Sequence, residues 1–135
     1  MGGYATSPTA PQALTLVAHG CQYYNGTSVT SPVAAFAANM TLATNTSTTP
    51  TLTITNPGWV VSYWAAKSST ITGWLVPAGQ LARGTADGTG GGHITSAASD
   101  IGAASPAGSV GAVTATTAAA QSSGTSWTVV LAPGS

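Results

Sequence analysis

The sequence has almost no charged side chains. Four of them make up 3% of its 135 residues: Lys67, Arg83, Asp87 and Asp100. Globular domains usually contain about 25% charged residues. The net charge is zero, so the chain offers no basic surface to nucleic acid or to an anionic membrane, and we expect neither as a partner. A surface made of Thr, Ser, Gly, Asn and Ala suits contact with other protein subunits instead.

The same scarcity excludes most catalytic chemistry. Asp87 and Asp100 are the two carboxylates of the whole sequence, and glycoside hydrolysis needs a pair acting together. Both stand close to glycines, where aspartate commonly forms turns, and both can pair with Arg83 or Lys67. A calcium loop needs several carboxylates, which this chain cannot supply. We therefore expect no enzyme and no cofactor.

Sulfur and imidazole groups are equally scarce. Cys21 is the single cysteine, so no disulfide can form within the chain. His19 and Cys21 could form a nucleophilic pair, but no orienting acid stands nearby, and a small buried cysteine is the better interpretation. With His93 they make three scattered ligand candidates, whereas structural zinc takes four at paired spacing. We expect no metal.

Targeting signals are absent as well. The first residues carry no positive charge, and no run of about 18 apolar residues occurs. We expect a protein made in a host cytoplasm without a signal peptide, and no membrane association.

Short strand patterns separated by turn residues fill the rest of the sequence. Residues 51–55 alternate, with Leu52 and Ile54 on one side and threonines on the other. In 59–64, Tyr63 and Trp64 have opposite parity, which indicates a central strand buried on both faces. Further strands are expected at 14–18, 71–76, 80–85, 93–98, 110–116 and 126–131. The alanine-rich stretch 32–43 is interpreted as loop or strand edge, with at most one helical turn.

These patterns predict an all-β protein, an antiparallel β-sandwich of jelly-roll type. Turn signals every 8 to 14 residues support it. The glycine-rich stretch 88–92 is expected to connect two strands of a hairpin, because a phosphate-binding loop would need a lysine after its last glycine. We place one domain at 13–135 and an extended arm at 1–12. The candidate assembly residues of the arm are Tyr4, Pro8 and Pro11.

Aromatic side chains supply the candidate binding residues. Most aromatic residues in strands belong to the core. Tyr23, Tyr24 and Trp74 are the better candidates for exposed contacts with a partner or a glycan.

Residues 50–133 resemble a β-sandwich module of actinobacterial secreted multidomain proteins and actinobacterial phage virion proteins. The resemblance is carried by the run 59–69 and by the segments 77–79, 88–92, 106–108, 114–117 and 127–133, together with Arg83 and Asp100. Two departures matter. The module usually has an acidic residue where Ala66 stands, and an N-terminal half that this chain lacks. The resemblance therefore implies a truncated sandwich that oligomerisation completes, and it supplies no catalytic residue.

Together these observations predict a non-enzymatic structural protein on a virion surface. We expect a capsid decoration or stabilisation protein that forms homo-oligomers, with a trimer favoured, and contacts the major capsid protein through intersubunit β pairing. The alternative is a glycan-binding or adhesive module of a phage tail appendage or bacterial surface protein. A self-assembling fibre subunit is a further alternative, since neutral, threonine-rich strands pair readily at their edges.

Overall fold

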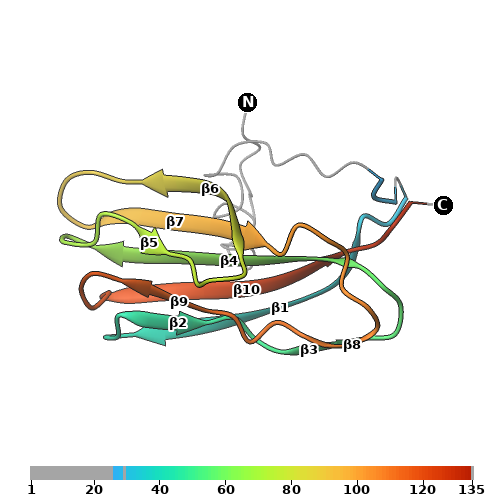
Figure 1. The fold of residues 1–135 in the computed structure, drawn as a ribbon. Helices are drawn as coiled ribbons and strands as arrows, with labels where there is room; N and C mark the ends of the chain where they lie inside the picture. Colours follow the sequence, from blue (N-terminus) through green and yellow to red (C-terminus); the bar gives the residue numbers. More distant parts are fainter. Residues whose placement is uncertain (1–25, 29, 135) are drawn as a thin grey trace.

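The described part of the protein is built from antiparallel strands, as predicted (Figure 1). A computed structural model describes residues 26–28 and 30–134. The strands are β1 (Val33–Leu42), β2 (Thr46–Thr48), β3 (Leu52–Ile54), β4 (Trp59–Ser68), β5 (Trp74–Leu75), β6 (Leu81–Asp87), β7 (His93–Asp100), β8 (Gly108–Val110), β9 (Thr114–Thr117) and β10 (Ser123–Leu131). Within these ranges no helix is long and apolar enough to cross a membrane. The expected arm 1–12, the expected strand 14–18 and the residues Tyr4, Pro8, Pro11, His19, Cys21, Tyr23 and Tyr24 lie outside the described residues.

One layer is a five-stranded sheet in the order β1-β10-β4-β7-β6, with every neighbour antiparallel. Its central strand β4 is rich in aromatic and β-branched residues, which favour a pleated, buried surface. Tyr63 and Trp64 are both fully buried although they point to opposite faces. The prediction of a central strand buried on both sides is confirmed.

The second layer consists of two small sheets, β2-β9-β5 and β3-β8. They cover the face of the large sheet that carries Trp64 and Val60, here called the inner face. Trp64 packs near Trp74 of β5, with ring centroids 6.4 Å apart, and its indole N–H donates to the carbonyl of Ser47 at 3.0 Å. Val60 packs with Ile54 of β3.

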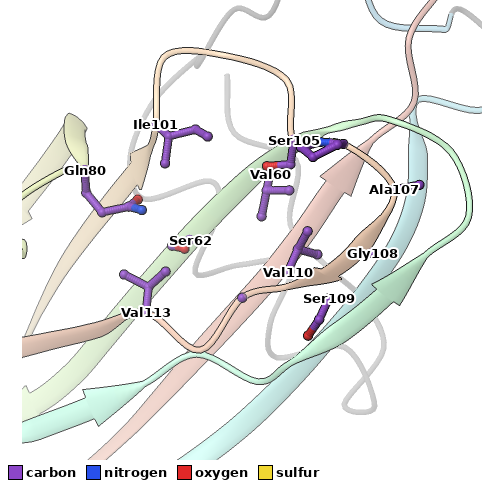
Figure 2. A pocket seen from close by; sticks show the side chains of 12 residues that line it. Val60, Ser62, Gln80, Ile101, Ser105, Ala107, Gly108, Ser109, Val110 and Val113 are labelled. Carbon is purple, nitrogen blue, oxygen red and sulfur yellow. The ribbon is translucent and has the colours of Figure 1, made fainter.

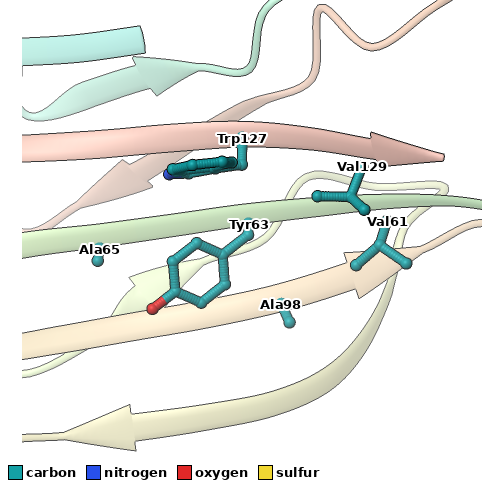
Figure 3. Packing of buried hydrophobic residues seen from close by; sticks show 6 residues of the cluster. All are labelled: Val61, Tyr63, Ala65, Ala98, Trp127 and Val129. Atoms are coloured by element: carbon teal, nitrogen blue, oxygen red, sulfur yellow. The ribbon is translucent and has the colours of Figure 1, made fainter. Parts of the chain in front are cut away.

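The opposite, outer face of the large sheet carries a second apolar cluster (Figure 3). Its members come from β4, β7 and β10 and are Val61, Tyr63, Ala65, Ala98, Trp127 and Val129, with Trp59 and Leu131 packed against them. Burial raises the pKa of the Tyr63 phenol to about 12, and a hydrogen bond with the Ser96 hydroxyl offsets part of that effect.

Several strand boundaries differ from the sequence prediction. Within the stretch 32–43, Val33–Leu42 forms β1, an edge strand without a helical turn. Pairing with β10, which has one register shift between Val33 and Ala35, outweighs the weak helix preference of its alanines. The expected strand 110–116 is split into β8 and β9 at Gly111, which has a φ of +93°. Of 71–76, two residues are paired, as β5. The stretch 88–92 joins β6 to β7 as the predicted hairpin connection.

Candidate functional site

Trp74, the one candidate contact residue in the described ranges, lies in the core. Its side chain is 9% exposed, and its indole N–H donates to the carbonyl of Thr95 at 3.2 Å. In the two-residue strand β5, it is Leu75 that faces solvent, at 72% exposure. The structure therefore corrects the expectation of an exposed aromatic surface at Trp74, since its indole is used to join β5 to β7.

Two of the four charged side chains form an ion pair. The Arg83 guanidinium donates from Nε and Nη2 to the two carboxylate oxygens of Asp100, at 2.8 Å each. The Gly102 N–H donates to the same carboxylate at 2.7 Å. Burial opposes ionisation of Asp100, but the hydrogen bonds from Arg83, Trp59 and Gly102 together with the Arg83 charge hold its pKa below the usual value. Arg83 and Asp100 thus fasten β6 to the end of β7.

His93 also joins parts of the fold. Its Nδ1 lies within hydrogen-bond distance of the Gly90 carbonyl and its Nε2 lies 2.6 Å from the Ile71 carbonyl. These two contacts raise the pKa of the imidazole, because the protonated ring can donate to both carbonyls. The contact with the Gly90 carbonyl contributes most. Among residues 26–28 and 30–134, no three potential metal ligands come together.

Two cavities lie beside the sheet, and uncharged residues line both. One, of about 310 Å³, opens between β4 and the segment 105–113 (Figure 2). Its lining offers the hydroxyls of Ser62, Ser105 and Ser109 and the amide of Gln80, which accepts a hydrogen bond from Ser99. The other, of about 390 Å³, lies between β1 and the segment 53–57. Neither lining contains a side chain that can act as an acid or a base near neutral pH.

Three of the four most exposed large apolar side chains of the described residues lie along β1. Phe36, Met40 and Leu42, here called the β1 strip, are 63%, 80% and 66% exposed. They share one parity, so they lie in a row on the outer face of the strand. Phe36 stacks on Trp127 of β10, with ring centroids 6.0 Å apart and planes inclined by 20°. The β1 strip therefore continues the apolar cluster of the outer face to the edge of the sheet.

Three of the four charged side chains lie on the other side of the sheet, and the fourth lies on its central strand. Arg83 and Asp87 belong to β6, and Asp100 ends β7. Lys67, near the end of β4, is opposite Ile94 of β7 in the register. β1 and β10 contain no charged residue. One edge of the large sheet is thus polar and charged, and the other is neutral and apolar.

The sequence analysis missed the β1 strip. The signal was present, since Phe36, Ala38, Met40 and Leu42 alternate with Ala37, Asn39 and Thr41. The neighbouring alanines also fit a helical turn, and this hides the alternation.

Comparison with known proteins gives a distant likeness. No protein-family model matches the chain, and no curated protein matches it either. A solved structure does match, the tripod (BppUct-A-L) from the baseplate of bacteriophage Tuc2009, with 16% sequence identity and a TM-score of 0.39 over 82% of this chain and 70% of that chain. None of these comparisons supports the expected capsid decoration.

Proposed function

We propose that the chain is a non-enzymatic building block of a larger protein assembly, with a phage tail appendage as its setting. The observation that carries the assembly role is the β1 strip, an exposed apolar row on a long edge strand. Apolar rows of this kind mark contact surfaces between proteins. The resemblance of residues 50–133 to a module of phage virion proteins supports the viral setting.

The charges and cavities support a role without catalysis. Asp100 is held by Arg83 in a structural ion pair, and His93 is held between two backbone carbonyls. The cavities offer hydroxyl and amide groups alone. Glycan binding through Trp74 is not proposed, because that indole is buried in the core.

The uncharged edge supports association in particular. Burying ions at an interface costs several kcal/mol for each ion unless each is well paired. β1 and β10 have no ions to bury, so contact there gains from apolar burial without that cost.

Sedimentation velocity of the purified chain across a range of concentrations tests the assembly role. We expect a stable oligomer at micromolar concentration. A chain that stays monomeric at all concentrations would contradict the proposal. The setting is tested separately by gold-labelled antibodies on virions of the phage that encodes the chain, where labelling of the tail supports it and labelling over the capsid contradicts it.

A further inference from the structure

We propose that β1 pairs with β1 of a second copy, antiparallel and centred on Ala38, so that the two large sheets become one. This inference rests on the proposed assembly role and names the surface that performs it. β1 (Val33–Leu42) forms one edge of the large sheet. It pairs with β10 on one side and with no strand of the described residues on the other.

The available strand edges differ in charge, in length and in where their pairing is irregular. At the far end of the large sheet, β6 carries Arg83 and Asp87 and a register shift between Ala82 and Gly84. Charges and bulges are the usual means by which proteins prevent edge strands from pairing. The small sheets end in β2 and β5, of three and two residues. β1 is ten residues long and carries no charge. It has a register shift with β10 at its first residues, between Val33 and Ala35, and the register is regular from Ala35 to Leu42.

The edge of β1 complements itself. In an antiparallel pair centred on Ala38, Phe36 of one copy lies opposite Met40 of the other, and the same contact occurs twice. Leu42 lies opposite Ala34, and Ala38 lies opposite itself. Ala34 stands at the register shift between Val33 and Ala35, so parity does not fix its face. The residues from Phe36 to Leu42 with even numbers share the outer-face parity, so the apolar rows of the two copies meet on one face there. Cross-strand pairs of aromatic and aliphatic side chains stabilise such ladders.

A second copy of this chain is the partner that fits the edge of β1. Two identical edges repel each other when they carry charge, and here neither β1 nor β10 carries any. A pair with identical contacts in both directions closes upon itself, which gives a defined dimer instead of an open fibre. The occupant is therefore a second copy of this chain, and the pair has two-fold symmetry, unlike the trimer that the sequence analysis favours.

Cross-linking tests the register. In a Cys21→Ser background, Ala38→Cys places one thiol of each copy opposite the other, whereas Thr85→Cys places an equally exposed thiol on β6 as a control. A short bis-maleimide should convert the Ala38→Cys chain to a covalent dimer and leave the Thr85→Cys chain uncoupled. Equal yields from both variants would mean random collision and would overturn the inference.

Variants that place a charge on the edge of β1 distinguish β1 pairing from the more general assembly role. Met40→Lys adds a charge to the β1 strip, and Leu75→Lys adds one to an equally exposed position on β5. We expect Met40→Lys to weaken self-association by at least about tenfold, because two buried lysines would face apolar side chains. Leu75→Lys should leave it unchanged, and both variants should keep the circular dichroism of the folded chain. A wild-type monomer would refute the assembly role itself, and an oligomer that survives Met40→Lys would overturn β1 pairing while leaving that role intact.

Discussion

Hydroxyl and indole groups, more than ions, hold the two layers of this protein together. The Ser126 hydroxyl donates to the Thr48 carbonyl at 2.9 Å, and the Thr128 hydroxyl donates to the carbonyl of Pro50 at 2.5 Å. Both side chains belong to the inner face of β10, and both are fully buried. Buried backbone carbonyls need such donors, and serine and threonine supply them without the cost of burying a charge. In this way a chain with four charged residues satisfies these two carbonyls between its layers.

The ion pair of Arg83 and Asp100 is the exception at residue scale, and it gives a first prediction. Arg83→Ala should lower the free energy of unfolding at pH 7 by about 2 kcal/mol, because it leaves the buried Asp100 carboxylate with fewer donors. Water screens part of the attraction between the two charges, because the Arg83 side chain is 35% exposed. Urea denaturation measures the loss. Lys67→Ala, which removes an exposed cation, should change stability by less than about 0.5 kcal/mol.

The same pair sets a pH dependence. The pKa of Asp100 is lower in the folded protein than its ordinary value of 3.8. Its contribution to stability is therefore fully present above about pH 3.8 and is lost as the pH falls through the folded pKa. Arg83→Ala should reduce the loss in the free energy of unfolding when the pH is lowered below 3.8, as measured by urea denaturation. An equal loss in the variant and the wild type would contradict the role of the ion pair.

At the scale of elements, the β8–β9 connection depends on a glycine. A Cβ atom at Gly111 would collide with the carbonyl oxygen of Pro50 and would lie 2.7 Å from the Thr128 hydroxyl, and the φ of +93° is itself unfavourable for other residues. Gly111→Ala should cost about 3 kcal/mol or more, as measured by thermal or urea unfolding. Gly91→Ala is the matched control, because nothing lies within 4 Å of a Cβ at that position. Similar losses in both variants would contradict the packing argument.

The β6–β7 hairpin should respond to pH through His93. Contacts with the Gly90 and Ile71 carbonyls raise the pKa of its imidazole above the ordinary 6.5. The stabilisation that they give is therefore fully present below about pH 6.5 and is lost as the pH rises through the folded pKa. Comparing unfolding at pH 6 and pH 8.5 checks this, with His93→Gln as control. The wild type should lose more stability than the variant on that change, and an equal loss would refute the role of the ring.

A strand could be predicted where its own residues determine it, and could not where pairing with a distant segment does. The strand at 59–64 follows from its aromatic and β-branched residues, and its burial on both faces follows from parity alone. β1 did not follow, because its alanines fit helix and strand almost equally and pairing with β10, some ninety residues later, decides between them. For β5, two residues are too few for an alternating pattern, so parity could not indicate that Trp74 points inward and Leu75 outward.

The candidate site was harder to predict than the fold for a related reason. The apolar row of β1 can be recognised in the sequence, but its meaning depends on sheet order. Placed in the centre of the sheet, Phe36, Met40 and Leu42 would be ordinary core residues; at the edge they form an exposed strip. Sheet order is set by long-range pairing, which a single sequence does not reveal.

In the molecule as a whole, the first described segments pair with the last. β1 pairs with β10, and beyond these strands Thr27 bridges to Pro133, with the Ser28 N–H donating to the Ala132 carbonyl at 3.0 Å. β2 pairs with β9 and β3 with β8, so the second layer is also built from distant segments. Such non-local pairing slows folding. The edge that we propose for self-association therefore forms once the C-terminal strand is in place, which delays exposure of an ordered β1 to neighbouring copies.

The position of the two basic residues has a consequence for proteolysis and detection. Trypsin cuts after lysine and arginine, and Lys67 lies within β4 while Arg83 lies within β6 and is bound to Asp100. Proteases need an extended, unpaired segment, so both sites are protected while the sheet is intact. Even the unfolded chain yields three tryptic peptides, of which 68–83 alone is short. A protein of this composition resists trypsin in its native form and is easily overlooked in peptide surveys of purified particles, where chymotrypsin, acting at the aromatic residues, is the better choice.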